Sequence, residues 1–473
     1  MRANPSAGSK RPVSPEPRVT VVVLAAGKGV RMNSRTPKVL HLVAGRPMLL
    51  WLIAAARALD PERTLVVTNP AQDGVEAALN GDVQTVMQAK PLGTGHALAQ
   101  VSVAHRTSGP VVVLYADAPL IRGETLRQLL AGHEKSRAAV TVLTAKLEQP
   151  HGYGRIVRSR TGLFSDIVEE KDATAEQKKI TEVNSGVYVF SGRELWPALL
   201  RLENKNRAGE YYLTDIVRLI KGKIETVPIT DSNEILGIND RRQLAEAERV
   251  MRNRILDALM VNGVTITDPP TTFIDADVQI GRDTVVLPFS FITGESTIGQ
   301  DCVIGPFAQI NDSIIGDSCR IERAHLDRST LAQGVHVGPF SRLRPGSVLD
   351  DGVRVGTHAE IKNSHIGAGA AINHFSAVLD SDVGANANIG AGTVTANFDG
   401  VNKHRTEIGD RAQVGSDTIL VAPVSIGNDA YTAAGSVITT DVPAGSLAIE
   451  RTDQKTVPGW TERRRGRKRE VSK

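Results

Sequence analysis

The sequence predicts two domains of different fold class: an α/β domain with a mostly parallel sheet, followed by a parallel β-helix. The β-helix is predicted by aliphatic residues that recur every six positions through residues 280–438, as in Ile280, Val286 and Ile292. The α/β domain is predicted by apolar strand-like runs that alternate with helical stretches through residues 18–239. A chain of 473 residues has room for both.

The six-residue period is the more specific of the two signals. No helix has this period and an ordinary strand alternates every two residues, whereas a hexad forms one short strand and one corner. Three hexads close a triangular coil of about eighteen residues, and successive coils stack about 4.8 Å apart. Gly follows many of the aliphatics, as in Ile298-Gly299 and Ile389-Gly390. We expect these glycines to supply corner conformations that a Cβ would penalise.

In the first half, residues 19–25 form a continuous apolar run, as expected for a strand buried on both faces. Further strands are expected at 65–68, 111–115, 139–143 and 186–190, and helices at 47–59, 95–103 and 124–133. Ligands of such folds bind beyond the carboxyl ends of the strands. We therefore expect a site in the loops after Ala25, Tyr115 and Phe190.

Composition and charge exclude several classes of function. The chain is 41% hydrophobic but only 4% aromatic, as a solenoid filled by Ile, Val and Ala predicts. The net charge of +4 comes from residues 462–473, without which there are 49 basic and 50 acidic residues. We interpret this segment as a disordered tail and predict no specific nucleic-acid partner. No apolar run is as long as a membrane span.

The N-terminus and the cysteines favour the cytoplasm. Residues 1–17 are rich in Pro, Ser and basic residues and lack the apolar core of a signal peptide, so we predict a disordered extension. Cys302 and Cys319 each follow a hexad aliphatic by four residues, which places them on neighbouring coils of one face. We expect small buried thiols in a reducing compartment rather than a disulfide or a metal site.

Two loops of the first half carry candidate chemistry. The small residues from Leu24 to Gly29 can bring backbone amides close to phosphates, with Arg31 and Lys38 as cations. A single glycine-rich loop is a weak signal, and this one has neither the dinucleotide nor the P-loop spacing. Asp117 at the end of an apolar strand suits a divalent metal on phosphates better than it suits a helix N-cap before Glu124.

The order and identity of the motifs closely resemble those of one family. The motifs are Leu24-Ala-Ala-Gly27, Gln88 with Gly93-Thr-Gly95, Asp117, Gly152-Tyr-Gly-Arg155, Glu169-Glu170, Asn184-Ser-Gly186, Glu210-Tyr-Tyr-Leu-Thr-Asp215 and Gly237-Ile-Asn239, followed by the hexads. From about residue 19 to residue 451 the chain resembles the bifunctional bacterial N-acetylglucosamine-1-phosphate uridylyltransferase and glucosamine-1-phosphate acetyltransferase. The resemblance implies a Rossmann-like nucleotidyltransferase domain, a left-handed β-helix, and the synthesis of UDP-N-acetylglucosamine for cell-wall precursors.

For the first domain the resemblance implies that UTP and N-acetylglucosamine 1-phosphate react to give UDP-N-acetylglucosamine and pyrophosphate. Mg²⁺ would be bound by Asp117 and Asn239, with Arg31 and Lys38 stabilising charge on the phosphates. The resemblance implies that Leu24, Ala25, Ala26, Gly27, Gln88, Gly93 and Thr94 hold the uridine nucleotide and that Gly154, Glu169 and Asn184 hold the sugar. Further expected substrate contacts are Lys38, Tyr115, Ala116 and Asn239. Two residues depart from the family, Val30 in place of Thr and Ala116 in place of Gly, and we expect Ala116 to reduce nucleotide affinity.

In the β-helix, the hexads are interrupted by polar residues and by the insertion at residues 396–406. The resemblance implies acetyl transfer from acetyl-CoA to glucosamine 1-phosphate, with His374 as general base, in a site shared between the subunits of a homotrimer. The expected substrate contacts are Arg342, Lys362, Ala377 and Asn388, and those for acetyl-CoA are Ala391, Asn397, Phe398, Ser416, Ala434 and Arg451.

Here the departures from the family are heavier. Ala377 and Phe398 stand where the family has Tyr, Leu379 stands where it has Gly, and His358 and Ala359 replace apolar residues. A lost hydroxyl bond to a charged phosphate costs about 1.5–3 kcal/mol, which is about ten- to a hundredfold in binding or rate. We therefore expect the second activity to be weakened.

Three alternatives stay open from the sequence. The β-helix could serve only as a trimerisation scaffold, or the first domain could be a related nucleotidyltransferase for another sugar or another base. The chain could also be a binding or structural solenoid whose first domain is inert. Gln88 with Gly93-Thr94 favours uridine, and the presence of both Asp117 and Asn239 disfavours the solenoid. The predicted organisation is an extension at 1–17, a uridylyltransferase domain at 18–240, a linker helix at 241–262, an acetyltransferase β-helix at 263–451 and a basic tail at 452–473.

Overall fold

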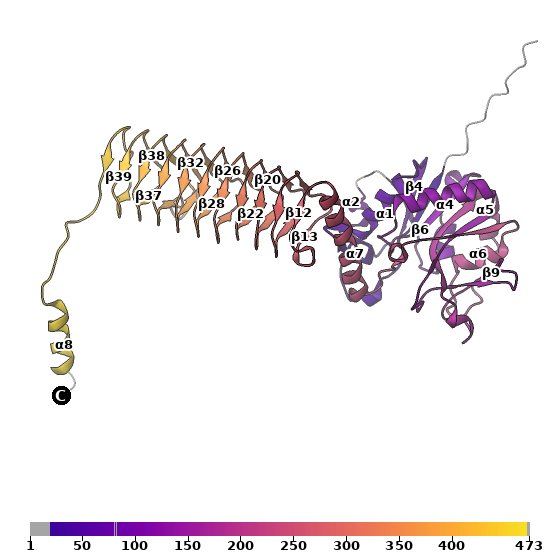
Figure 1. The fold of residues 1–473 in the computed structure, drawn as a ribbon. Helices are drawn as coiled ribbons and strands as arrows, with labels where there is room; N and C mark the ends of the chain where they lie inside the picture. The colour runs from indigo at the N-terminus through magenta and orange to yellow at the C-terminus, as the bar shows by residue number, and fades with distance from the viewer. Residues whose placement is uncertain (1–18, 80, 82, 471–473) are drawn as a thin grey trace, which may run out of the picture. The chain divides into compact units, whose positions relative to one another are not determined.

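The computed structural model describes residues 19–470 except residues 80 and 82, and it divides into two compact units, residues 1–254 and 255–473 (Figure 1). The predicted extension at 1–17 lies outside the described residues. No helix among the described residues has the length and apolarity needed to cross a bilayer.

The first unit is built on a nine-stranded sheet with the order β11-β7-β10-β6-β1-β4-β5 and the hairpin β8–β9 attached to β10. Its strands are β1 (Thr20–Leu24), β4 (Arg63–Thr68), β5 (Gln84–Met87), β6 (Pro110–Tyr115), β7 (Val140–Lys146), β8 (Arg155–Arg158), β9 (Phe164–Val168), β10 (Glu182–Ser191) and β11 (Ile224–Pro228). Along the main path only β10 runs antiparallel to its neighbours, so the mostly parallel sheet that the sequence predicts is confirmed.

Helices cover both faces of this sheet because its central strands are apolar throughout. Val21 and Val23 of β1 face one core with α1 and α4, and Val22 and Leu24 face the other with α3, α5 and α6. The helices are α1 (Met48–Arg57), α2 (Val75–Ala78), α3 (Thr94–Ala99), α4 (Gly123–Ser136), α5 (Gly192–Leu199) and α6 (Leu213–Leu219). The parallel strands β1, β4 and β6 end at one edge, and their carboxyl ends position the first site.

The helix α7 (Arg241–Val261) spans the segment predicted as a linker. Leu256 near its end is fully buried in the core of the second unit. The chain then winds through three parallel sheets of eleven, ten and nine short strands. The first sheet runs from β12 (Thr265–Ile266) to β41 (Leu447–Ala448), the second from β13 (Phe273–Ile274) to β40 (Val437–Ile438), and the third from β14 (Gln279–Ile280) to β38 (Val424–Ile426).

This arrangement is the parallel β-helix that the hexads predict, and Figure 1 shows its strands stacked coil upon coil. Each strand pairs in register with the strand one coil further on, as Ile274 pairs with Ile292 and Ile292 with Ile310. The inward aliphatics form one continuous core without a buried aromatic side chain among its members. The left-handed winding stays a prediction that the resemblance supplies.

The role predicted for the hexad glycines is wrong for most of them. Gly299, Gly390 and Gly415 do not have a positive φ. Instead, a Cβ on each would lie 2.5–2.7 Å from a backbone nitrogen of the next coil. Close stacking of the coils therefore excludes a side chain here, whereas residues such as Asp301 and Phe307, with φ of 57° and 58°, take the left-handed corner conformations.

In this unit the structure confirms the prediction for the cysteines and corrects the prediction for the tail. Cys302 and Cys319 are buried free thiols that precede the paired strands β18 (Val303–Ile304) and β21 (Arg320–Ile321), so they do lie on neighbouring coils. The tail predicted as disordered instead contains a helix, α8 (Trp460–Glu470), and its side chains from Trp460 to Arg465 are exposed.

Candidate active sites

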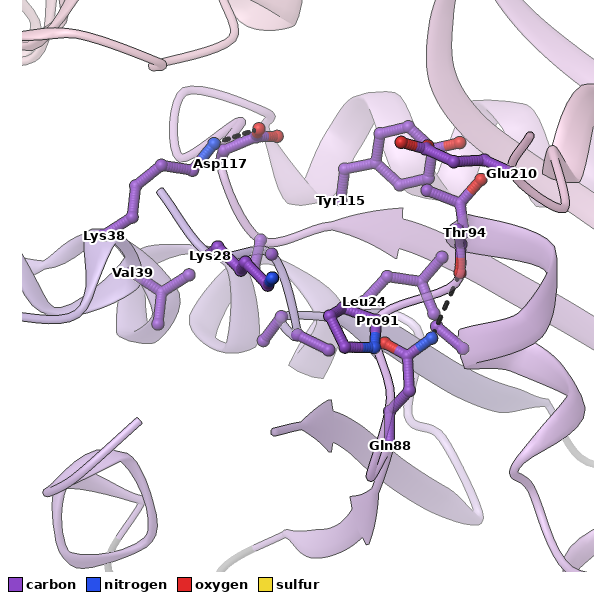
Figure 2. Close-up of a pocket in the computed structure, with 16 residues that line it drawn as sticks. Leu24, Lys28, Lys38, Val39, Gln88, Pro91, Thr94, Tyr115, Asp117 and Glu210 are labelled. Carbon is purple, nitrogen blue, oxygen red and sulfur yellow. Dashed lines mark hydrogen bonds and ion pairs between the residues drawn. The ribbon is translucent and has the colours of Figure 1, made fainter. Parts of the chain in front are cut away.

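A cavity of about 420 Å³ opens at the carboxyl ends of β1 and β6 in the first unit (Figure 2). All of the residues predicted to contact the nucleotide line this cavity, together with the predicted metal ligand Asp117. The predicted residues in its wall are Leu24, Ala25, Ala26, Gly27, Lys38, Gln88, Gly93, Thr94, Tyr115, Ala116 and Asp117. The sheet brings them together because β1 and β6 are parallel neighbours whose ends, Leu24 and Tyr115, are in register.

The loop after β1 leaves open space above its backbone, since a Cβ on Gly27 would meet no atom within 4 Å. Its carbonyl groups are bonded from the other side. Asn69 donates to the oxygen of Ala26 at 2.7 Å, and Gln72 donates to the oxygen of Ala25 at 2.7 Å. Neither Asn69 nor Gln72 is among the residues predicted from the sequence, although Asn69 directly follows a predicted strand, which is the position where site residues are expected.

The turn at Gly93 is fixed by a positive φ of 118° and by the backbone of Tyr211, whose oxygen would lie 2.6 Å from a Cβ. The buried Gln88 amide donates to the oxygen of Gly93 at 3.2 Å and lies 2.9 Å from Nδ1 of His96. Burial lowers the pKa of His96, which favours the neutral ring. Thr94 begins α3 and accepts a bond from the Leu213 amide at 3.0 Å.

Three side chains from distant parts of the chain converge at the other end of this cavity. The ammonium group of Lys38 donates to Oδ2 of Asp117 at 2.6 Å and to Oδ1 of Asn239 at 3.1 Å. Figure 2 shows the first of these bonds. Asp117 and Asn239 therefore present one oxygen each to the same cationic centre, and carboxylate and amide oxygens are the ligand types that a hard divalent cation prefers. Among the described residues no group of three or more His, Cys, Asp or Glu forms a metal site.

The predicted sugar contacts form a second cluster. A Cβ on Gly154 would lie 3.6 Å from both Asn184 Cβ and Glu169 Oε2, so the three residues are adjacent. Asn184 is held by its own amide bond to the Gly154 oxygen at 2.9 Å and by a side-chain bond to the Tyr188 hydroxyl at 2.6 Å.

Glu169 of this cluster accepts a bond from the Thr214 hydroxyl at 3.0 Å, and burial is the main cause that raises its pKa. Its negative charge also contributes to the raised pKa of Tyr115, after burial, which places it close to the nucleotide cavity. Glu169 itself lines a neighbouring cavity of about 470 Å³, together with Asp172, Tyr212 and Asp215.

The structure does not bring Arg31 to these residues. Arg31 lies exposed on a short 3₁₀ helix, Val30–Met32, outside the lining of the cavity. Ala116 is buried in the core, and its amide donates to the Leu24 oxygen at 3.1 Å. Lys38 rather than Arg31 is therefore the cation in the wall nearest to Asp117.

In the β-helix, four predicted residues share one cavity of about 410 Å³: His374, Asn388, Ala391 and Ser416. His374 follows β30 (Ala371–Ile372) at a corner, and Asn388 begins β33 (Asn388–Ile389), the next strand of the same sheet. The exposed His374 ring lies against Gly356, where a Cβ would be 3.1 Å from Nδ1. The spacing of successive coils thus brings to His374 residues that follow it by 14 to 42 positions in the sequence.

Lys362 lines a different cavity of about 540 Å³ with Lys403, His404 and Arg405. The neighbouring Lys403 is the largest cause that lowers the pKa of Lys362. Asn397 donates to the carboxylate of Asp380, which also lines this cavity. This concentration of positive charge suits a phosphate group.

The remaining predicted residues are more scattered. Arg342 and Ala377 lie on one sheet face, separated by Glu360, with which each is in register. Phe398 is 60% exposed on the inserted loop. Arg451 donates to the Ala434 oxygen at 3.1 Å, and neither of these two residues lines the cavity beside His374.

A mostly parallel sheet with a cavity at its strand ends, followed by a hexapeptide β-helix, is the architecture expected of a nucleotidyltransferase joined to an acyltransferase-type solenoid. Residues 21–218 match the MobA-like NTP transferase domain, and residues 305–378 match the GlmU-like C-terminal hexapeptide family. The relatives are similar over nearly their whole length. "Bifunctional protein GlmU" of Syntrophomonas wolfei is 46% identical over 93% of this chain and 99% of its own, and that of Streptomyces avermitilis is 44% identical over 94% of each chain. The chain belongs to the family of bifunctional GlmU proteins.

Family membership decides between the hypotheses left open by the sequence. The match includes the β-helix as well as the first domain, so the chain is a bifunctional enzyme of UDP-N-acetylglucosamine synthesis, with a uridylyltransferase and an acetyltransferase activity. The interpretation of the β-helix as a scaffold alone is thereby set aside.

Proposed function

We propose that each cavity region catalyses one of the two reactions. UTP and N-acetylglucosamine 1-phosphate bind beside Asp117 and react there, and acetyl-CoA and glucosamine 1-phosphate bind beside His374 and react there. The observation that carries the first half is the convergence of Lys38, Asp117 and Asn239 at the edge of one cavity. The proposed cofactor is Mg²⁺, held by Asp117 and Asn239 and by the phosphates of the substrate. When bound, it would offset negative charge on those phosphates.

The protein's own part in uridylyl transfer is positioning and charge stabilisation. A phosphate oxygen of the sugar attacks the α-phosphorus of UTP in line while the bond to pyrophosphate breaks, so no covalent intermediate with the protein is needed. The open backbone at Gly27 and the turn at Gly93 provide room for the nucleotide. Glu169 and Asn184 orient the sugar, and the Lys38 ammonium supplies positive charge beside the phosphates.

In the second half His374 acts as the general base. It takes a proton from the amine of glucosamine 1-phosphate as the nitrogen attacks the thioester carbon, the C–S bond breaks and coenzyme A leaves. The positive cavity beside Lys362 and Lys403 would hold the sugar phosphate, and Ala391 and Ser416 would lie along acetyl-CoA. A homotrimer formed through the β-helices and a cytoplasmic location, where these substrates occur, complete the proposal.

The test assays each half-reaction separately on the purified full-length chain. The rate of uridylyl transfer is measured as the release of pyrophosphate. Asp117→Asn should lower this rate by at least about a hundredfold, because the loss of one preorganised charge contact in such a site typically lowers kcat by that factor. It should leave coenzyme A release unchanged. His374→Ala should show the reverse pattern, since the two residues lie in different units. Near-normal uridylyl transfer by Asp117→Asn would exclude the metal assignment.

A further inference from the structure

The ammonium group of Lys38 occupies the point on which both proposed metal ligands converge. Its nitrogen lies 2.6 Å from Oδ2 of Asp117 and 3.1 Å from Oδ1 of Asn239. Both side chains of the ion pair are largely shielded, with exposed fractions of 10% for Lys38 and 26% for Asp117. An ammonium is a compact point charge with three donors, so it can satisfy two oxygens in the same way as a small cation.

The ammonium and a divalent cation cannot hold this position together. A Mg²⁺ ion ligated by the same two oxygens at about 2.0–2.1 Å would compete with the ammonium group for the lone pairs that these oxygens direct toward the shared position. Two positive centres within this distance also repel each other strongly in a partly buried site. One cation must therefore leave when the other binds.

The backbone around the two oxygens is fixed, which makes the lysine the part that moves. The Ile238 amide donates to the main-chain oxygen of Asp117 at 2.8 Å, and the Asn239 amide donates to Oε1 of Gln243 at 2.7 Å. Lys38, by contrast, has a flexible four-carbon side chain and lines the same cavity as the nucleotide loop. Its ammonium can turn from Asp117 toward a phosphate without leaving the cavity.

We propose that Lys38 holds the metal position in the nucleotide-free enzyme and is displaced onto the nucleotide phosphates when the divalent cation enters. This inference rests on the proposed function, which assigns the metal to Asp117 and Asn239. It makes cation binding and nucleotide binding mutually dependent: the phosphates draw the ammonium away, and the vacated oxygens accept the metal. A free cation without nucleotide has to compete with a positive charge that the chain itself supplies.

The experiment measures Mn²⁺ binding to the full-length chain without nucleotide, from the electron paramagnetic resonance signal of free Mn²⁺. Lys38→Met removes the competing charge and should bind Mn²⁺ at least about tenfold more tightly than the unchanged chain. Lys38→Gln, which keeps a neutral hydrogen-bond donor, should also bind Mn²⁺ more tightly than the unchanged chain. This variant replaces Lys38→Met in the experiment if the Met variant does not fold. Lys28→Met is the matched control, because Lys28 lines the same cavity but bonds to neither oxygen among the described residues, and its Mn²⁺ affinity should not change.

A double variant separates the inference from the assignment on which it rests. The affinity gained in Lys38→Met should be lost again when Asp117→Asn is added. If folded Lys38 variants bind Mn²⁺ no more tightly than the unchanged chain, the exchange is wrong, and the assay of Asp117→Asn still tests the metal assignment. If the gain appears but persists in the double variant, the metal does not bind at Asp117 and the proposed assignment fails with the inference.

Discussion

At the scale of single residues, His133 couples the stability of the first unit to pH. It lies buried on α4, with Nδ1 2.9 Å from the Thr141 hydroxyl of β7, and burial lowers its pKa from 6.5 to about 4. Between about pH 6.5 and pH 4 the unfolded chain binds a proton at His133 that the folded chain does not. The contribution of this residue is therefore complete above about pH 6.5 and is lost progressively as the pH falls toward 4.

The corresponding prediction compares the unchanged chain with His133→Gln, which cannot titrate but keeps a polar group for Thr141. Urea unfolding is measured by tryptophan fluorescence, to which the first unit contributes Trp51 and Trp196, whereas Trp460 of the second unit is already exposed in the folded chain. Between pH 6.5 and 4.5 the free energy of unfolding should fall more steeply for the unchanged chain than for the variant. Equal slopes would show that His133 is already protonated in the folded state.

Substitution of Ala377, which stands where the family has Tyr, tests whether this difference weakens acetyl transfer. Ala377 lies half-buried on β31 (Ala377–Leu379), three residues after His374. Ala377→Tyr should raise kcat/KM for glucosamine 1-phosphate by about ten- to a hundredfold, because it restores a hydroxyl that can bond a charged phosphate. Ala377→Phe, which restores the ring alone, should give little of this gain. Equal rates in both variants would assign the effect to packing.

Residue types at the ends of predicted strands could be identified from the sequence, but their convergence could not. Lys38 is 79 residues from Asp117 and 201 from Asn239, and only the tertiary fold brings a 3₁₀ helix, the end of β6 and the loop before α7 together. The resemblance supplied the ligand pair, yet nothing in the sequence showed that Lys38 bonds both. Arg31 was predicted from its neighbourhood in sequence, whereas the local 3₁₀ helix leaves it exposed outside the cavity.

At the scale of secondary-structure elements, the sequence predicted the buried central strands and the periodic coils and missed the exposed edge strands. The hexads predicted the β-helix because every inward position repeats in phase. The edge strand β5 was missed since most of its residues are exposed and no apolar run marks it. The hairpin β8–β9 and the edge strand β11 are likewise mixed in burial, so their pairing depends on neighbours far away in the chain.

The glycines of the β-helix give a prediction for this scale. Gly299 carries no positive φ, but a Cβ there would lie 2.7 Å from the Asp317 nitrogen. Gly334 has a φ of 68° and nothing within 4 Å of a Cβ. Gly299→Asn should therefore destabilise its coil by about 1–3 kcal/mol, as overpacking does, whereas Gly334→Asn should cost much less because Asn tolerates the left-handed region.

Hydrogen exchange followed by mass spectrometry resolves the two positions, because coils of a solenoid open in part independently. Gly299→Asn should speed exchange in β17 (Thr297–Ile298) and in its partner β20 (Ile314–Ile315). If Gly334→Asn speeds exchange in its coil more than Gly299→Asn does in its own, the positive φ of the corner, rather than the close spacing of the coils, is the reason that glycine is required.

At the scale of the whole molecule, each unit contains the residues proposed for one activity. Those of uridylyl transfer lie between Leu24 and Asn239, and those of acetyl transfer between Arg342 and Arg451. The end of the first unit is tied to its body by α7, whose Arg254 donates to the Leu120 oxygen at 2.6 Å and whose Glu248 accepts from the Ala44 amide at 2.6 Å. A chain ending after Asn262 keeps these contacts intact.

We expect this shortened chain to retain uridylyl transfer within about threefold, to lose acetyl transfer and to be a monomer, while the full-length chain is a trimer. The physical reason is that the charge contacts of the first site come from within one unit, whereas the β-helix carries the proposed contact between chains. Light scattering measures the mass of each species against the 50.6 kDa of one full-length chain. A trimeric short chain would place the subunit contact in the first unit, and a large loss of uridylyl transfer would show that this site needs groups from beyond residue 262.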